Sequence, residues 1–149
     1  MAIWFGNPRI EETRASHLGL LASHLGIEFT EFGVDFLRGT MPVEPRVHQP
    51  MGYLHGGASL VLAETLGSVA ANYVVDPARQ RCMGQEINAN HLRPVSDGLV
   101  TGVARPLHIG ARSQVWSIEI RDPRERLVCV SRLTMAVLEW RTKTEDRKS

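Results

Sequence analysis

The stretch HQPMGYLHGGASLVLAETLGSVAANYVV, residues 48–75, decides how the rest of the chain is arranged. From Gly57 onward it is apolar on nearly every face for about five helical turns, which is the pattern of a helix buried on all sides. One carboxylate, Glu64, lies in the middle of this run. Because a buried charge is costly unless it is paired or used in chemistry, Glu64 is the first candidate for a functional residue.

The start of this helix allows close approach by another molecule. Gly56 and Gly57 follow His55 and carry no side chain that would cover the backbone. The N–H groups of a first helical turn have no partner inside the helix, and the helix dipole adds positive potential there. We therefore expect this end to bind an anion or a developing oxyanion.

Composition indicates an ordinary soluble domain. The chain has 149 residues, of which 43% are hydrophobic and 22% are charged, and its formal net charge is +1. This length supports one core, so we predict a single domain over residues 1–140. The near-zero charge argues against nucleic acid as a partner. Residues 141–149, RTKTEDRKS, are predicted to form a charged, disordered tail.

Several classes of site and location are excluded by pattern. Cys82 and Cys129 lack the CxxC spacing of a metal or redox site, no HExxH motif is present, and we expect no metal. Without a secretory pattern at the N-terminus, reduced thiols in the cytoplasm are expected. Glu64, Ser68 and Asn72 interrupt the apolar run, which argues against a membrane span.

The remaining segments predict an α+β fold. One or two short helices are expected over residues 8–25, and an ordered, proline-rich loop over 42–53. Strands are expected at 26–32, 34–43, 83–92, 99–107, 113–121 and 127–138. Two strands, a long helix and four more strands indicate one antiparallel sheet wrapped around the helix. One sheet covers only part of such a helix, and the simplest cover for the remainder is the N-terminal helix together with a second subunit.

At this point the chain resembles the hotdog-fold acyl-CoA thioesterases. The resemblance is to the branch of the Arthrobacter-type 4-hydroxybenzoyl-CoA thioesterase, the 1,4-dihydroxy-2-naphthoyl-CoA hydrolases and the phenylacetate-degradation thioesterases. It covers nearly the whole chain, from about residue 23 to residue 138. Its most specific motifs are HQP (48–50), LHGGAS (54–59), AETLGS (63–68), EINANHLRP (86–94) and PLHIG (106–110).

The resemblance implies hydrolysis of an acyl-CoA, aromatic or medium-chain, to a free acid and coenzyme A, with no further cofactor. In the family, the carboxylate at Glu64 attacks the thioester or activates the attacking water, and the sequence leaves both roles open. Gly56 is then the oxyanion donor, Gln49 and His55 orient the thioester and water, and Ser68 lies one turn from Glu64 on the same face. Three of these residues also have a structural alternative: Glu64 as a buried, satisfied carboxylate, His55 as a helix cap and Gln49 as an exposed loop amide.

The family resemblance also implies a shared site and a coenzyme-binding surface. The loop of one subunit faces the helix of its partner, so we expect at least a homodimer, and a dimer of dimers (a homotetramer) as the complete assembly. Arg93 and Arg112 are the expected phosphate partners, unless both are simply solvated. The full set expected to contact coenzyme A is Gly84, His91, Leu92, Arg93, Pro94, His108, Ile109, Gly110, Ala111, Arg112 and Ser113.

The chain departs from its relatives at two positions, and the carrier of the acyl group and the function each have alternatives. Relatives carry a second histidine at the position of Leu92, and here the cation of the later turn is Arg112, after Ala111. An acyl carrier protein could replace coenzyme A, and the acyl group is not specified. A hotdog dehydratase acting on a hydroxyacyl thioester and a non-catalytic acyl-CoA-binding protein are the alternative functions. The candidate pocket residues are Leu21, Leu25, Met51, Tyr53, Val61 and Leu62.

Overall fold

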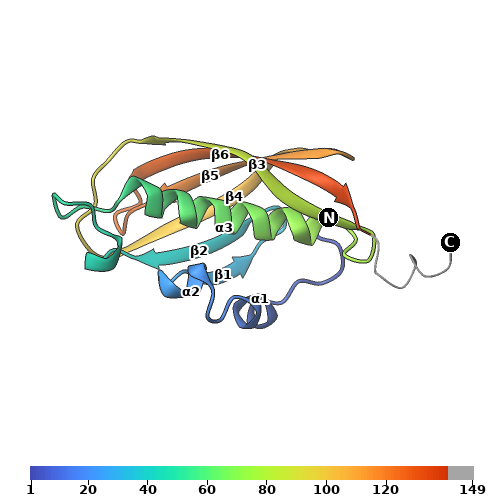
Figure 1. Ribbon diagram of the computed structural model, residues 1–149, viewed down its shortest axis with the longest axis horizontal. Coiled ribbons are helices and arrows are strands. Elements are labelled where there is room, and N and C mark those ends of the chain that lie inside the picture. Colours follow the sequence, from blue (N-terminus) through green and yellow to red (C-terminus); the bar gives the residue numbers. More distant parts are fainter. Residues whose placement is uncertain (141–149) are drawn as a thin grey trace.

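The long helix α3 (Gly56–Val74) runs through the middle of the molecule (Figure 1). The computed structural model describes residues 1–140, so the predicted tail at 141–149 lies outside the described residues. The helix begins where His55 Nδ1 accepts a hydrogen bond from the Gly57 N–H at 2.8 Å. It ends before Pro77, whose ring cannot continue a helix. The expected long, largely apolar helix is therefore present.

Six antiparallel strands form one sheet that curves around one side of α3. Their spatial order is β1-β2-β4-β5-β6-β3, so the strand that follows α3 lies at the opposite edge from the β1–β2 hairpin. This confirms the predicted hotdog arrangement. The strands are β1 (Glu28–Phe32), β2 (Leu37–Pro42), β3 (Gln80–His91), β4 (Leu99–Ile109), β5 (Ser113–Arg121) and β6 (Leu127–Glu139).

The core lies between α3 and the inner face of the sheet. Gly39 of β2 and Gly102 of β4 are direct partners in the sheet, and a Cβ atom on either would lie 2.7 Å from a methyl group of Leu66. The missing side chains therefore allow Leu66 to insert against the strands. Side chains alternate along β5 as a half-buried strand requires, and its buried residues are Gln114, Trp116, Ile118 and Ile120.

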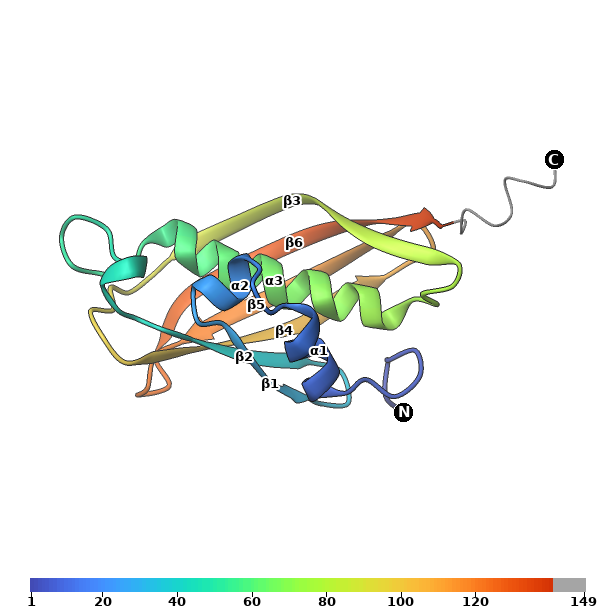
Figure 2. The same ribbon diagram turned by 60° about the horizontal axis from the view of Figure 1, so that its bottom comes forward.

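The N-terminal segment lies against α3 and β1 (Figure 2). It contains two short helices, α1 (Ile10–Ser16) and α2 (Leu21–His24), as predicted. Thr13 Oγ1 lies 2.9 Å from the Tyr73 hydroxyl of α3, and Arg14 Nε donates to the Phe29 carbonyl at 2.8 Å. A single turn of 3-10 helix, η1 (Pro45–Val47), precedes the loop that leads into α3. These contacts fix α1 beside the C-terminal half of α3.

Strand β3 forms one edge of the sheet and pairs only with β6 among the described residues. It starts at Gln80 instead of residue 83, because its pairing with β6 continues as far as Glu139. Gln85 is an extra residue, since the register shifts between Gly84 and Glu86. Within residues 1–140, no helix combines the length and apolarity needed to cross a membrane.

Candidate active site

Glu64 lies half-buried in the middle of α3, on the side that faces β3. Ser68, one turn later, donates a hydrogen bond from Oγ to Glu64 Oε1 at 3.2 Å. Gly84 of β3 passes directly over the carboxylate, and a Cβ atom at this position would overlap Glu64 Oε1. The structure thus brings Glu64 and Ser68 together as expected. It places Gly84 with them, away from residues 91–94, and across β6 from the start of β5 at Ser113, since Met83 and Ser113 both pair with Ala136.

The N-terminus of α3 presents one free donor. The Gly57 N–H is used by His55 Nδ1, and the N–H groups of Ala58 and Ser59 donate to the His55 carbonyl at 2.9 and 3.2 Å. The Gly56 N–H has no acceptor within residues 1–140. A Cβ atom on Gly56 would lie 2.8 Å from His91 Nε2, so the His91 ring borders this donor. A carbonyl oxygen placed here would receive a hydrogen bond at a helix N-terminus.

His55 acts as the N-terminal cap of α3. Its Nδ1 accepts the Gly57 N–H, so in the neutral ring the proton is on Nε2. The ring is exposed, and Nε2 is therefore a donor that faces solvent in this chain. Capping does not exclude the expected contact with a thioester, because the two ring nitrogens serve different partners.

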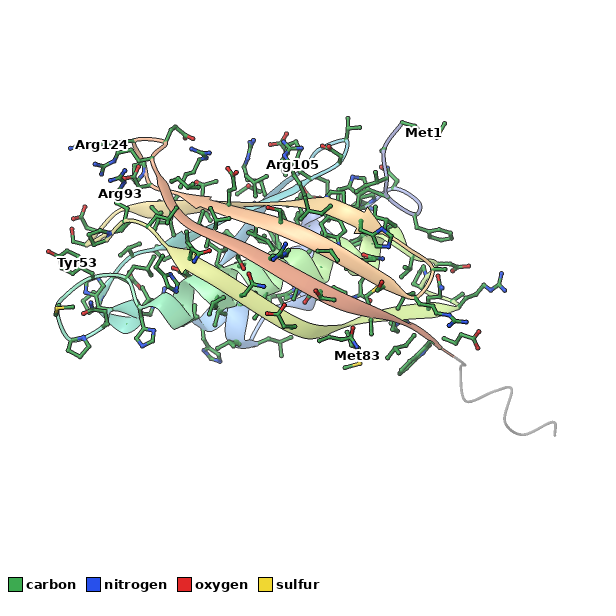
Figure 3. All side chains as sticks on the ribbon, turned by 90° about the horizontal axis from the view of Figure 1, so that it is seen from above. Met1, Tyr53, Met83, Arg93, Arg105 and Arg124 are labelled. Carbon is green, nitrogen blue, oxygen red and sulfur yellow. The ribbon has the colours of Figure 1, made fainter. Side chains whose placement is uncertain are left out.

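The loop before α3 is ordered by its own hydrogen bonds. The Gln49 N–H donates to the Tyr53 carbonyl at 2.8 Å, and the Gln49 side-chain oxygen accepts from the Met51 N–H. This leaves the Gln49 amide nitrogen as a donor. A pocket of about 530 Å³ adjoins the loop, and Tyr53 and Arg93 lie at the same end of the molecule in Figure 3. The pocket is lined by Gln49, Met51, Tyr53, Leu54, Gly56, Ser59, His91, Leu92, Arg93, Pro94 and Val128.

The predicted residues form two clusters in one chain. We call Gln49, Gly56 and His91 the entrance cluster, and Glu64, Ser68 and Gly84 the carboxylate cluster. Gly56 and Glu64 are eight residues apart, which is about 12 Å along the helix axis. A thioester carbonyl bonded to the Gly56 N–H is therefore out of reach of Glu64 in the same chain.

The later turn expected to bind the coenzyme, residues 108–113, lies at the other end of the sheet from His91. His91 pairs with Cys129 near the start of β6, whereas the Arg112 carbonyl accepts the Val137 N–H at 2.9 Å near its end. Residues 129 to 137 of a strand span about 26 Å. Arg93 and Arg112 of one chain are thus not adjacent, and a pocket of about 710 Å³ near that far end contains no predicted site residue.

A smaller pocket of about 320 Å³ lies between α1 and α3, beside Ser68. Sequence reasoning missed its residues from α1. The polar residues Glu64, Ser68 and Asn72 recur every fourth position of an otherwise apolar helix, and this spacing indicates a polar stripe that extends past Ser68. The lining is Thr13, Ser16, His17, Ser68, Val69, Asn72 and Tyr73. Of the pocket residues suggested by sequence, Met51 and Tyr53 line the larger pocket, and Leu62 is fully buried in the core.

We also considered a cysteine nucleophile and a metal site among the residues that the structure describes. Burial raises the pKa of the Cys82 thiol to about 11 and also raises the pKa of Cys129, so both thiols stay protonated at neutral pH. Neither qualifies as a thiolate nucleophile. Over residues 1–140, no three His, Cys, Asp or Glu side chains are grouped so that they could hold a metal ion.

Comparisons with known proteins point to one family. Residues 51–129 match the thioesterase superfamily. The chain is 51% identical to proofreading thioesterase EntH of Cronobacter turicensis over 136 residues, which is 91% of this chain and 98% of that protein. It is 57% identical to 1,4-dihydroxy-2-naphthoyl-CoA hydrolase of Escherichia coli over 102 residues, 68% of this chain and 74% of that one.

The structural comparison agrees. The crystal structure of a mutant of thioesterase PA1618 from Pseudomonas aeruginosa is similar to this chain with a TM-score of 0.92 and 44% sequence identity. The similarity covers 93% of this chain and 100% of that chain. A second crystal structure, of thioesterase HI1161 from Haemophilus influenzae, has a TM-score of 0.89 and 44% identity, over 92% of this chain and 95% of that one.

Proposed function

Because this chain belongs to the thioesterase superfamily and is a thioester hydrolase, we propose that it cleaves an acyl-CoA into a carboxylic acid and coenzyme A, with Glu64 as the reactive carboxylate. The proposal combines the free Gly56 N–H, the exposed Gln49 loop and the carboxylate cluster in one reaction. The names of the relatives describe thioesterases and a CoA hydrolase. The residues above supply the base or nucleophile and the oxyanion donor that thioester hydrolysis requires.

The surroundings of Glu64 carry this proposal. It is the one charged side chain of α3, and within residues 1–140 no cation forms an ion pair with it. Its hydrogen bond comes from the neutral Ser68 hydroxyl. A half-buried carboxylate that serves only the fold usually gains a cation or several donors in exchange for the water that it loses. Glu64 is instead held by one weak donor and is left open for chemistry.

Two routes use this carboxylate, and both conserve atoms. As a general base, Glu64 takes a proton from water while the hydroxide oxygen bonds to the carbonyl carbon. The C–S bond then breaks, and the proton passes to the coenzyme A sulfur. As a nucleophile, Glu64 bonds to the carbonyl carbon, coenzyme A leaves as a thiolate that is protonated by solvent, and water cleaves the resulting anhydride. In both routes the Gly56 N–H donates to the developing oxyanion.

The distance between the two clusters supports a site shared by two subunits. About 12 Å separates Gly56 from Glu64 along α3, so one chain cannot place the oxyanion donor over its own carboxylate. A second copy related by a twofold axis brings its entrance cluster to the first chain's carboxylate cluster. Edge strand β3 provides backbone groups for pairing with that copy. Exposed apolar side chains on the same molecule also favour a partner, namely Leu18, Leu20, Leu21, Met51 and Met83.

The pocket beside Ser68 is proposed to hold the acyl group, and its hydrogen bonds indicate what it accepts. Thr13 Oγ1 donates to the Arg9 carbonyl at 3.0 Å, so its bond to Tyr73 uses the Tyr73 hydroxyl hydrogen. His17 Nδ1 lies 2.8 Å from the Thr13 carbonyl and must donate, which leaves Nε2 as an acceptor in the neutral ring. Ser16 Oγ also donates to the Thr13 carbonyl, at 2.8 Å.

The donors of this pocket on α3 are already bonded: the Tyr73 hydroxyl to Thr13, the Ser68 hydroxyl to Glu64, and the Asn72 amide to Ser68 and Cys82. Acceptors remain at the Tyr73 oxygen and at His17 Nε2, whereas the Ser16 oxygen already lies 3.1 Å from His17 Nδ1. Acceptors select a ligand that donates. Among the acyl groups under consideration, an aromatic ring with a hydroxyl group donates a hydrogen bond, and a medium-length alkyl chain does not. We therefore favour a hydroxylated aromatic acyl group.

The coenzyme is proposed to lie along the larger pocket, with its phosphates near Arg93. Arg112 is too far from Arg93 in one chain to bind the same phosphates, so its expected role requires a contribution from another subunit. A guanidinium can bond two phosphate oxygens at once, which suits Arg93 at the rim of this pocket.

The test is thiol release from 4-hydroxybenzoyl-CoA, benzoyl-CoA and hexanoyl-CoA by the wild type, Glu64→Ala and Glu64→Gln. We expect the wild type to turn over, and both variants to lose about 10²-fold or more in kcat while folded, because neither side chain can be a base or nucleophile. The hydroxylated ring should be preferred over benzoyl-CoA about five-fold in kcat/KM, the factor from one hydrogen bond of about 1 kcal/mol.

Tyr73→Phe is the matched variant for the acyl pocket, since it removes one oxygen and keeps the ring. It should reduce the preference for the hydroxylated substrate and leave benzoyl-CoA turnover nearly unchanged. Glu64 variants as active as the wild type would refute the proposed mechanism. Binding of acyl-CoA without thiol release would favour the acyl-CoA-binding alternative instead.

A further inference from the structure

Asn72 makes three hydrogen bonds, two to edge strand β3 and one within α3. Its Oδ1 accepts the Cys82 N–H at 2.9 Å, and its Nδ2 donates to the Cys82 carbonyl at 3.0 Å. Nδ2 also donates to the Ser68 carbonyl at 3.0 Å. One side chain therefore holds both backbone groups of Cys82 and ties them to the turn of α3 that carries Ser68.

This connection lies next to the carboxylate cluster on both elements. Asn72 follows Ser68 by one helical turn, and Ser68 bonds Glu64. Cys82 precedes Gly84 by two residues, and Gly84 passes so close to Glu64 that a Cβ atom would overlap the carboxylate oxygen. The distance between β3 and Glu64 is thus fixed by contacts that lie one helical turn from Ser68 and two residues from Gly84.

The side-chain contact from Asn72 matters more for an edge strand, which has one neighbouring strand in its own chain, than for an inner strand, which has two. β3 is held by β6 on one side only in the described part of the chain, and a bulge at Gln85 interrupts that pairing directly after Gly84. Asn72 supplies the contact on the other side, just before the bulge. Without it, the segment from Cys82 to Gly84 would lose both of its hydrogen bonds to α3, whether or not a second copy pairs with β3 further along the strand.

We propose that Asn72 is a positioning residue that fixes β3 over Glu64 and so sets the space in which the carboxylate reacts. The inference rests on the proposed function, because it concerns the geometry of the same carboxylate. Asn72 acts through Cys82 and Gly84 and touches no reacting atom. Catalysis depends on placement to within about 1 Å, so a loosened β3 should slow the chemical step.

The experiment compares Asn72→Ala and Asn72→Asp with the wild type on 4-hydroxybenzoyl-CoA. Asn72→Asp keeps the shape and one acceptor and loses both donated hydrogen bonds. We expect both variants to lose about 10- to 100-fold in kcat with little change in KM. Hydrogen exchange should show faster exchange of the backbone amides of residues 82–85 than in the wild type. The protection of β5 should stay unchanged.

Asn88→Ala is the matched control. Asn88 lies on the same strand, but its side chain bonds the Glu86 carboxylate at 3.1 and 3.2 Å and no residue of α3. It should keep both kcat and the exchange rates of residues 82–85. Asn72 variants with wild-type kcat overturn the proposal, as does a loss of kcat without faster exchange at 82–85. If the wild type itself releases no thiol, the proposed function fails first, and the positioning role fails with it.

Discussion

At Gly84, the absence of a side chain lets β3 pass directly over the Glu64 carboxylate. A methyl group here would overlap Glu64 Oε1 and displace either the carboxylate or the strand. The glycine therefore leaves the carboxylate room to stay beside Ser68. Its φ is not in the left-handed region, so backbone freedom is not the reason for it.

We expect Gly84→Ala to lower kcat by about 10²-fold, because the carboxylate is forced out of its position beside Ser68. The variant should remain folded, since only the end of one side chain has to move. Steady-state kinetics and circular dichroism measure the two effects. Gln85→Ala, at the exposed bulge next to it, serves as the control and should keep the wild-type rate. A Gly84→Ala protein with normal kcat would show that reaction does not depend on the fit between β3 and Glu64.

On the scale of elements, the turn between β5 and β6 is held by one buried carboxylate. Asp122 Oδ1 accepts the N–H groups of Arg124 and Arg126 at 2.9 and 3.0 Å, and Oδ2 accepts from Arg126 Nε at 2.8 Å. Burial by itself would raise the pKa of Asp122, but the hydrogen bonds from Arg126 and Arg124 outweigh it and lower the pKa below 3.8. Glu125 adopts a left-handed conformation with φ of 59° to close the turn.

This turn should make stability depend on pH in acid. The folded pKa of Asp122 is below its unfolded value, so its stabilisation is fully present above about pH 4 and is lost as the pH falls through the folded pKa. Asp122→Asn should be less stable than the wild type at pH 7, and the difference should shrink towards pH 2. Urea unfolding across this range measures it. Asp97→Asn, in another exposed turn, is the control, and a difference that stays constant with pH would contradict the assignment.

On the scale of the whole molecule, α3 separates the proposed oxyanion donor, the Gly56 N–H, from the proposed reactive carboxylate, Glu64. The entrance cluster and the carboxylate cluster lie about 12 Å apart along one rigid helix, and local rearrangement cannot join them without unfolding α3. The proposed reaction therefore needs a second copy to bring them together. Activity should therefore fall on dilution to monomer.

Mixing two inactive variants tests the shared site directly. Gln49→Ala and Glu64→Gln should each be nearly inactive as homodimers. After subunit exchange, half of the dimers are mixed, and each mixed dimer has one intact site of two, so about one quarter of wild-type activity should return. Thiol release before and after exchange is the measurement. No recovery, with mixed dimers demonstrated by mass spectrometry, would mean that each site is built from one chain.

The sequence by itself determined the elements and the local geometry of the site. The apolar run with one carboxylate defined α3, and the turn residues separated the six strands. The bounds differ in detail: β1 and β2 start later than predicted, β3 starts earlier and β4 ends later. Glu64 and Ser68 could be placed together because residues four apart on a helix share a face. The His55-Gly56-Gly57 start likewise implied a free backbone donor. These features depend on short-range geometry, which the order of residues fixes.

Only the tertiary structure decided which distant residues meet. The register of β3, with its bulge after Gly84, places Gly84 over Glu64 and lets Asn72 hold Cys82. The packing of α1 on α3 places His17 near Ser68. Strand β4 (Leu99–Ile109) runs between residues 91–94 and residues 108–113 and puts them at opposite ends of the sheet. The physical reason is that such contacts depend on strand register and element packing, which are set by the sum of many long-range contacts and not by local spacing.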